Sequence, residues 1–291
     1  MAISMEMIKD LRQRTGAGIM ECKEALKESN MDMEAAQAYL RKKGASKAAK
    51  KAERSAKEGV IAAFVDGATA SILEIKCETD FVARNETFQG LASSLAEHVA
   101  ANDDAPDESG FLGQTFKGNS SLTVKELLSN KVFEMGENIV VGRRAKLGLQ
   151  GPGLFVTYIH GVGNIGVILE VGAESDETAS KPEVTEMGKD IAMQIAAMNP
   201  VAMRPEEIPA DIIEREKDIY TAQARESGKP ENIIPKIVEG GLKKFYSESC
   251  LLSQAFVKDN KKNIQAVVNE TAKQAGGALE IRRFVRYQLG E

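Results

Sequence analysis

Cys77-Glu78-Thr79-Asp80-Phe81-Val82-Ala83-Arg84-Asn85 is the stretch at which a predicted strand gives way to a predicted helix. The strand is expected over residues 70–76, directly before it. After it, apolar residues recur at the spacing of one helix face, at Phe81, Phe88, Leu91, Leu95 and Val99. Strand and helix therefore meet near Thr79 and Asp80. Either residue can cap the first turn, because a short polar side chain accepts hydrogen bonds from the free N–H groups of a helix start.

Two interpretations of Phe81 are open from this pattern. In the first, Phe81 begins the inner face of the helix and belongs to the core. In the second, Asp80 and Phe81 stay outside. A junction between strand and helix can then project a large ring beside a carboxylate, which is how anchor residues reach into a partner's pocket.

The segment from Thr79 to Asn85 resembles the signature of the elongation factor Ts family. A second block near the start of the chain supports the resemblance, at Leu11-Arg12-Gln13-Arg14-Thr15-Gly16-Ala17-Gly18, Cys22-Lys23 and Ala25-Leu26. The similarity runs from about residue 8 to the last residues. It therefore covers nearly the whole chain.

The resemblance implies a guanine-nucleotide exchange factor that acts in translation elongation. Its partner would be elongation factor Tu, in the GDP-bound and nucleotide-free forms. In the family, the Asp and Phe of the signature displace the partner's magnesium ion and so promote GDP release. The resemblance assigns this role to Asp80 and Phe81, and it includes their neighbours Thr79 and Val82 in the same site. The resemblance implies no catalytic site, cofactor or metal in the chain itself.

Matching positions elsewhere imply further contacts with elongation factor Tu. They are Arg12, Ile19, Met20 and His160. Each has a second interpretation that the sequence leaves open. The first three can belong to the thin core of a small helical module, and His160 can be a polar residue flanking a hairpin turn.

Composition limits the classes of protein to consider. At 291 residues the chain is long enough for two or three domains. The cysteines, Cys22, Cys77 and Cys250, are too widely spaced for a disulfide framework or paired metal ligands. Residues 1–10 lack the apolar core of a signal peptide, and no apolar run is long enough to span a membrane. These features predict a cytoplasmic protein with no membrane partner.

Residues 1–41 are predicted to form three short helices, which the family resemblance identifies as a ubiquitin-associated-like module. The first helix is expected to end at the glycine-containing break near Gly16. Asp32 can cap the third helix. The inner face of that helix is expected at Ala35, Ala36, Tyr39 and Leu40.

Eight basic residues lie within residues 41–57, against the single acidic residue Glu53. We interpret residues 42–58 as a basic linker, helical in part because alanine and lysine favour helix. The alternative is an RNA-binding arm, since clustered basic side chains release counterions from phosphates. No aromatic residue that could stack on bases lies among the charges. The linker is therefore favoured, and no direct binding to nucleic acid is expected.

The remainder of the chain looks duplicated. Each copy begins with a hairpin whose second strand is similar, Ser71-Ile72-Leu73-Glu74-Ile75 in one and Val167-Ile168-Leu169-Glu170-Val171 in the other. Each continues with an alanine-rich helix and ends in a strand carrying paired arginines. This pattern predicts an α+β fold with antiparallel sheets and approximate internal symmetry. The first copy is placed at 59–150 and the second at 151–202 and 251–291.

The second copy is longer, and the surplus is predicted to be an insertion at 203–250. Pro205 and Pro209 suit helix starts, and Gly228-Lys229-Pro230 is a turn between two helical patterns. We therefore expect an antiparallel helical hairpin of coiled-coil type. The family resemblance implies that this helical hairpin is a possible homodimer contact.

A glycine pattern in the second hairpin does not indicate a nucleotide site. Gly161-Val162-Gly163-Asn164-Ile165-Gly166 matches G-x-G-x-x-G, but a strand is expected after it rather than a helix. We interpret it as a turn. No phosphate-binding loop and no catalytic arrangement is apparent, so we expect a protein that acts by binding. Two rivals stay open: an RNA-binding or ribosome-associated protein acting through 41–57, and an enzyme with an unrecognised site in the core.

Overall fold

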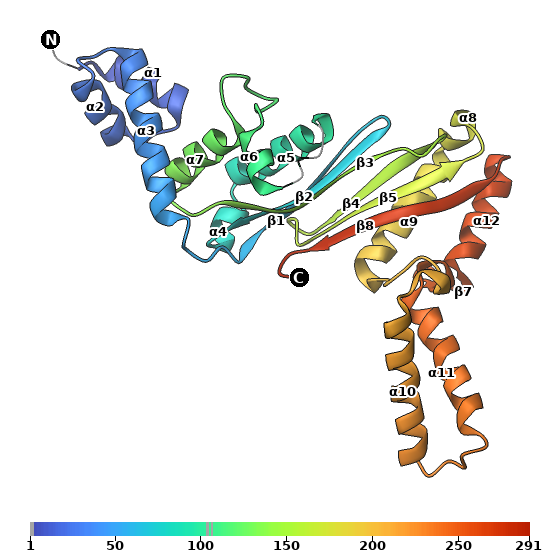
Figure 1. Ribbon diagram of the computed structural model, residues 1–291. Coiled ribbons are helices and arrows are strands. Elements are labelled where there is room, and N and C mark those ends of the chain that lie inside the picture. The colour runs from blue at the N-terminus through green and yellow to red at the C-terminus, as the bar shows by residue number, and fades with distance from the viewer. Residues whose placement is uncertain (1–2, 103–104, 106) are drawn as a thin grey trace. The chain divides into compact units, whose positions relative to one another are not determined.

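A computed structural model describes residues 3–102, 105 and 107–291 (Figure 1). Each of two units combines a three-stranded sheet with helices, which confirms the predicted α+β class. The first unit comprises Met1–Leu147, Ile159–Gly166 and Tyr287–Glu291. The second comprises Gly148–Tyr158 and Val167–Arg286.

Three helices begin the first unit, namely α1 (Met5–Thr15), α2 (Ile19–Glu28) and α3 (Met33–Lys51). Gly16 ends α1 in a left-handed conformation, and Asp32 caps α3 by accepting a hydrogen bond from the Ala35 N–H at 2.8 Å. The buried residues are Ile8, Leu11, Ala17, Cys22, Ala25, Leu26, Ala36 and Leu40. Ala35 was predicted to face inward, but it is exposed because it lies in the first turn of α3, on the outer side.

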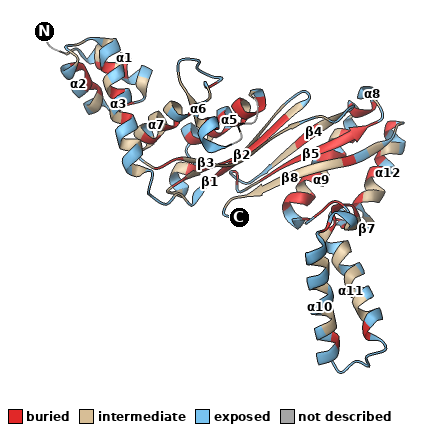
Figure 2. Cartoon of the chain, in the orientation of Figure 1, coloured by how far each residue is buried: buried red, intermediate tan, exposed pale blue. Residues whose placement is uncertain are grey.

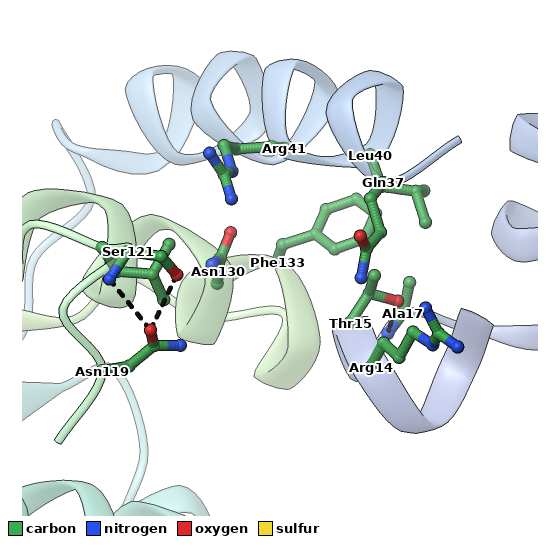
Figure 3. Close-up of a pocket in the computed structure, with 11 residues that line it drawn as sticks. Arg14, Thr15, Ala17, Gln37, Leu40, Arg41, Asn119, Ser121, Asn130 and Phe133 are labelled. Carbon is green, nitrogen blue, oxygen red and sulfur yellow. Dashed lines mark hydrogen bonds between the residues drawn. The ribbon is translucent and has the colours of Figure 1, made fainter. Parts of the chain in front are cut away.

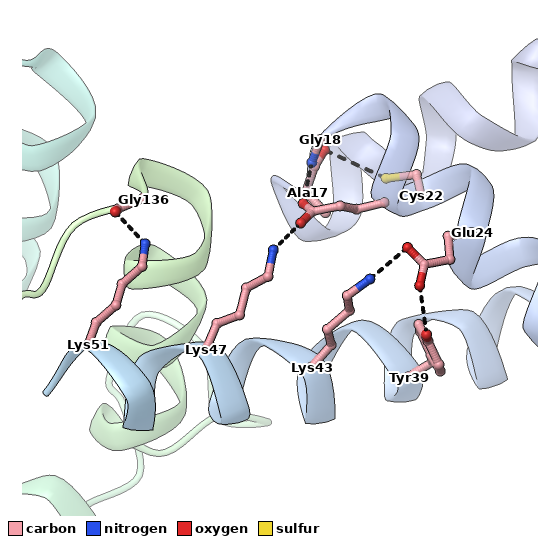
Figure 4. A network of polar contacts seen from close by, with 10 residues as sticks. Ala17, Gly18, Cys22, Glu24, Tyr39, Lys43, Lys47, Lys51 and Gly136 are labelled. Atoms are coloured by element: carbon pink, nitrogen blue, oxygen red, sulfur yellow. Dashed lines mark hydrogen bonds and ion pairs between the residues drawn. The ribbon is translucent and has the colours of Figure 1, made fainter.

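Helix α3 continues through most of the basic segment, so the predicted boundary between residues 1–41 and 42–58 falls inside a helix. Four of the basic side chains contact other parts of the chain, and Figure 4 shows three of them, Lys43, Lys47 and Lys51. Lys43 and Lys47 pair with acidic residues of α2, and Lys51 donates a hydrogen bond to the Gly136 carbonyl. Arg54 Nη1 lies 3.5 Å from the Glu78 carboxylate. These side chains therefore have structural partners.

The first sheet has the strand order β1 (Glu58–Asp66), β2 (Thr69–Cys77), β3 (Val140–Gly148). The antiparallel register of β1 and β2 runs from the Glu58–Cys77 pair to the Asp66–Thr69 pair at the turn, which confirms the first predicted hairpin. Helix α5 (Glu86–Ala101) packs against β1 and β2. It buries Phe88, Leu91, Leu95 and Val99 against the sheet. Two more helices complete the unit, α6 (Glu108–Gly113) and α7 (Val124–Met135), and α7 packs against α3.

The helix expected to start near Phe81 is divided in two, which corrects the prediction of one continuous face. The single turn α4 (Asp80–Ala83) ends first, and α5 starts again at Glu86. Asn85 causes the break: its backbone is extended, and its side chain accepts a hydrogen bond from the Thr87 N–H at 2.8 Å. This is a cap for a new helix. Phe81 therefore does not share the buried face of α5.

The second unit repeats the plan of the first. Its sheet has the strand order β4 (Gly153–His160), β5 (Ile165–Ala173), β8 (Leu279–Gln288). The accompanying elements are α8 (Asp176–Ala179), α9 (Pro182–Met198), η2 (Leu251–Ser253), β6 (Ala255–Phe256), β7 (Asp259–Asn263) and α12 (Ile264–Ala275). The tip of the β4–β5 hairpin and the end of β8 group with the first unit. Residues 161–164 form the turn, so the glycine pattern there leads into a strand, as predicted.

Each sheet buries one glutamate of its central strand against arginine from the returning strand. Glu74 of β2 is 1% exposed, and Arg143 Nη2 lies 3.2 Å from its carboxylate. Glu170 of β5 is fully buried, and Arg283 Nε lies 2.6 Å from its carboxylate. A buried carboxylate needs such a partner, since desolvation otherwise disfavours its charge. The repeated pair is direct structural support for the duplication.

The predicted insertion forms η1 (Pro205–Glu207) and two antiparallel helices, α10 (Ala210–Glu226) and α11 (Ile234–Ser249). These two helices are mainly exposed or half-buried along their length (Figure 2). Their base has a small core of Ala202, Ile208 and Cys250. The chain enters and leaves the hairpin side by side, because the Leu251 N–H donates to the Ala202 carbonyl at 2.9 Å.

No helix in the described ranges is both long and apolar enough to cross a membrane.

We predict that His98 makes the first unit less stable in mild acid. His98 is buried, and its Nδ1 accepts a hydrogen bond from the Lys117 N–H at 3.1 Å, so Nε2 carries the proton toward Gln114. Burial is the main cause that lowers the pKa of His98. As the pH falls below about 6.5, His98 binds a proton in the unfolded chain but not yet in the folded chain. The free energy of unfolding therefore decreases.

Urea unfolding at about pH 7.5 and about pH 5.5 measures this effect, with a loss of about 1 kcal/mol assigned to His98. The His98→Gln variant should lose less stability over the same interval, because glutamine does not titrate. Equal losses in parent and variant would show that His98 does not cause the pH dependence.

We predict that the helical hairpin can be removed without unfolding the second unit. Replacing residues 204–248 with a short Gly-Ser linker joins two segments that already lie side by side, so loop closure costs little. The melting temperature should shift by a few degrees, and calorimetry should still show a cooperative transition. Loss of that transition would mean that α10 and α11 belong to the core.

Candidate functional site

The exposed ring of Phe81 is the central feature of the candidate site. Helix α4 follows β2 directly, and Phe81 on this single turn is 81% exposed. A ring this exposed contributes little to the protein's own core and is available to contact a partner. Of the two interpretations of Phe81, the core one is excluded by this exposure.

Thr79 connects α4 to the rest of the unit. Its hydroxyl oxygen caps the helix by accepting a hydrogen bond from the Val82 N–H at 3.3 Å. The same hydroxyl donates to the Glu137 carboxylate at 2.6 Å. One side chain therefore both starts the helix and attaches it to the segment that precedes β3.

The remaining residues of α4 divide between surface and core. Asp80 is exposed, and one of its carboxylate oxygens lies 3.8 Å from Arg84 Nε. Val82 is partly buried against the core of the first unit, and Ala83 is buried. The helix is thus held by its inner face, while Asp80 and Phe81 extend side by side into solvent.

The second unit contains an equivalent helix with a different surface. Strands β2 and β5 are each nine residues long, and α4 and α8 follow them at the same distance in sequence. Ser175 caps α8 as Thr79 caps α4. The position of Phe81 is occupied there by Glu177, whose side chain is 84% exposed. The fold therefore does not require a ring at this position.

The tip of the β4–β5 hairpin lies next to α4 within the first unit. The Gln89 side-chain amide donates hydrogen bonds to the Ala83 carbonyl at 2.6 Å and to the Val162 carbonyl at 3.2 Å. The Ile61 N–H also donates to the Gly163 carbonyl at 2.7 Å. His160 is exposed on the same tip, beside the exposed Val162. The structure thus brings the tip that carries His160 close to α4.

The three candidate residues of the N-terminal helices are all on the surface. Arg12 is exposed on α1, while Ile19 and Met20 are 47% and 73% exposed at the start of α2. None of them belongs to the small core of α1, α2 and α3. Ile19 and Met20 thus expose two neighbouring apolar side chains, which suit contact with another protein.

Sequence reasoning missed three residues that support α4. They are Gln89, Glu137 and Asn138. Gln89 lies within a predicted helix but is not one of its predicted apolar positions, and no sequence signal links it to α4. Glu137 and Asn138 follow the glycine that ends α7, and no sequence signal pairs them with residues 78 and 79, which are distant along the chain. Only the folded sheet brings them together.

Other features of the described chain offer weaker sites. A small cavity of about 210 Å³ lies between the N-terminal helices and α7, with Arg14 and Arg41 at its edge (Figure 3). It is smaller than a typical ligand pocket of roughly 300–1,000 Å³. Within residues 3–102, 105 and 107–291, no group of three or more His, Cys, Asp or Glu side chains could hold a metal ion.

The cysteines do not form a reactive site. All three are buried and free. Burial is the largest cause that raises the pKa of Cys77 to about 12, and its thiol donates to the Thr79 carbonyl at 3.2 Å. A thiol with a raised pKa is a weak nucleophile near neutral pH. Cys77 is therefore part of the support beneath α4.

Comparison with known proteins supplies independent information. The family profile described as elongation factor TS matches residues 78–291. Curated relatives with the name elongation factor Ts are similar over the whole chain. One from Nitratiruptor sp. is 46% identical, covering 100% of this chain and 94% of its own. Those from Nitratidesulfovibrio vulgaris and Lawsonia intracellularis are 43% and 44% identical, covering 100% of this chain and 97% and 100% of their own.

We predict that Phe81 and Phe88 differ sharply in their effect on stability. Phe81→Ala should change the free energy of unfolding by no more than ~0.5 kcal/mol, because the ring is exposed. Phe88→Ala should cost ~3–5 kcal/mol, because Phe88 is fully buried. Urea unfolding of both variants tests this. Comparable losses would mean that Phe81 packs against the protein in solution.

Proposed function

The chain belongs to the elongation factor Ts family and is therefore a translation elongation factor, and from this premise we propose that it binds elongation factor Tu and promotes the release of GDP. GTP can then bind the emptied partner. The protein acts in this proposal by binding alone, and the bound nucleotide and magnesium ion belong to the partner.

One observation carries the proposal: the exposed ring of Phe81 on a short, firmly attached helix. The ring is not needed for the fold, since Glu177 occupies the equivalent position of the second unit. It is large, apolar and 81% exposed, which is typical of an anchor at the centre of an interface. Its neighbour Asp80 adds a carboxylate to the same surface.

In the proposed mechanism, Phe81 enters the partner beside its magnesium site and Asp80 follows. The ring displaces groups that hold the metal, and the carboxylate adds a negative charge where phosphate oxygens already lie. The first effect weakens the binding of Mg²⁺, and the second disfavours the phosphates of GDP by repulsion between like charges. Thermodynamic linkage makes the effect mutual, so bound GDP must weaken the binding of this protein by the same factor.

The other candidate residues would enlarge the contact surface. Ile19 and Met20 offer exposed apolar side chains on α2, and Arg12 offers an exposed cation on α1. His160 lies on the hairpin tip next to α4. Since hot spots are few in most interfaces, we expect these residues to affect affinity more than the rate of release at saturation.

The alternative functions gain little support from the side-chain contacts. An RNA-binding arm needs free basic side chains, but Lys43, Lys47 and Lys51 have partners within the protein. An enzyme needs converging reactive groups, and among the described residues no group of three or more His, Cys, Asp or Glu side chains could hold a metal ion. Dimerisation through α10 and α11 stays a prediction.

We predict that Phe81→Ala slows the release of GDP from elongation factor Tu at saturating concentrations of this protein. The loss should be ~2 kcal/mol or more in transition-state stabilisation, as for other anchor residues. Phe81→Glu, which copies the second unit, should behave in the same way. Asp80→Ala should have a smaller effect, and the double variant should be non-additive because both residues act in one pocket.

Stopped-flow release of a fluorescent GDP analogue measures these rates, with thermal melting to confirm that each variant is folded. Glu177→Ala is the matched control, because it changes the equivalent position of the second unit. If Phe81→Ala and Glu177→Ala both release GDP at the parent rate, Phe81 is not the active anchor.

A further inference from the structure

The carboxylate of Glu137 holds the junction between β2 and α4 at three points. Oε2 accepts hydrogen bonds from the backbone N–H groups of Glu78 at 3.1 Å and Thr79 at 3.0 Å. Oε1 accepts the Thr79 hydroxyl at 2.6 Å. Hydrogen bonds to an ionised acceptor are roughly twice as strong as neutral ones. We call these three contacts the Glu137 bridge.

A second carboxylate returns the contact in the opposite direction. Glu78 Oε1 accepts a hydrogen bond from the Asn138 N–H at 2.7 Å. The buried side chain of Asn138 in turn donates to the Arg54 carbonyl at 2.8 Å. The two segments therefore hold each other, and the chain that follows α3 is attached to the same place. A short helix with such support has little freedom to tilt.

The second unit keeps the reciprocal contact but lacks the Glu137 bridge. Glycines end α7 and α12 in the same left-handed conformation, with φ of 80° at Gly136 and 74° at Gly276. Glu174 accepts a hydrogen bond from the Ala278 N–H at 3.0 Å, as Glu78 does from Asn138. Gly277 occupies the position of Glu137, and a Cβ there would lie 2.6 Å from the Thr178 hydroxyl.

The Glu137 bridge thus occurs only in the unit whose short helix carries an exposed ring. The duplicated sheet forms without it, so the fold alone does not explain it. We infer that Glu137 is a positioning residue, which holds Thr79 and α4 so that Phe81 and Asp80 meet the partner in one orientation. This inference rests on the proposed function. Pre-ordering of this kind lowers the entropy lost on binding.

Glu137→Gln is the direct test, because the amide has nearly the same shape but no charge, so its single oxygen makes weaker hydrogen bonds to the Glu78 and Thr79 N–H groups and its nitrogen cannot accept any. Glu126→Gln is the matched control. Glu126 Oε2 accepts the Thr123 N–H at 2.9 Å and the Thr123 hydroxyl at 3.2 Å, a similar contact at the start of α7. Both variants lose a helix-start carboxylate of the same unit, but only one loses support for α4.

We expect Glu137→Gln to slow GDP release from elongation factor Tu roughly tenfold at saturation, as when support behind a functional group is lost. Amide hydrogen exchange over residues 79–85 should become faster in the isolated protein. Glu126→Gln should leave both measurements near the parent values. Added to Phe81→Ala, the Glu137→Gln change should cause little further slowing, because it acts through Phe81.

Substitutions at Thr79 give a second test should Glu137→Gln fold poorly. Thr79→Ser keeps the hydroxyl and should release GDP clearly faster than Thr79→Val. Thr79→Val removes the hydroxyl and should resemble Glu137→Gln. If Ser and Val variants release GDP equally fast, the contact between Thr79 and Glu137 does not position α4.

The outcomes separate this inference from the proposed function. If Phe81→Ala is slow but Glu137→Gln matches Glu126→Gln, the positioning role is wrong and the proposed function stands. If the parent protein does not accelerate GDP release, the proposed function fails, and if Phe81→Ala releases GDP at the parent rate, Phe81 is not the anchor. Amide exchange then still decides the role of Glu137: unchanged exchange over 79–85 overturns it, and faster exchange supports it.

Discussion

The early end of α4 is the constraint on which the functional surface depends. Phe81 and Phe88 are seven residues apart, so one continuous helix would place both on the same face. Asn85 ends that continuity by capping a new helix, and its side chain accepts the Thr87 N–H at 2.8 Å. Phe88 then enters the core, while Phe81 is left in solvent. A single extended residue thus separates a core position from an exposed one.

The internal duplication distinguishes what the fold requires from what the first unit has added. Both units keep a buried glutamate paired with arginine, a left-handed glycine and a capped helical turn after the central strand. The exposed ring of Phe81 and the carboxylate of Glu137 have no counterpart in the second unit, where Glu177 and Gly277 lie. These two differences coincide at one junction, which favours a shared role.

Local patterns were sufficient to predict much of this fold. A predicted strand and its repeat later in the chain indicated the hairpins, Asp32 marked a helix start, and prolines with a glycine turn placed the inserted helical hairpin. The sequence could not show the break at Asn85, because the apolar spacing continues across it. Nor could it show that Glu137 contacts Thr79, since that pairing depends on how β3 returns beside β2. Long-range polar contacts leave no periodic signal.

The central claim is that Phe81 acts on the partner's magnesium ion, and the dependence of GDP release on free Mg²⁺ tests it most directly. Release from elongation factor Tu would be followed with parent protein and with Phe81→Ala, from millimolar Mg²⁺ to excess chelator. If the ring works by displacing the metal, the ratio of the GDP-release rates of parent protein and Phe81→Ala should shrink as Mg²⁺ is removed. The chelator then does the same work as the ring, and the binding of metal and ring is linked. An advantage that stays constant across the titration would contradict the claim.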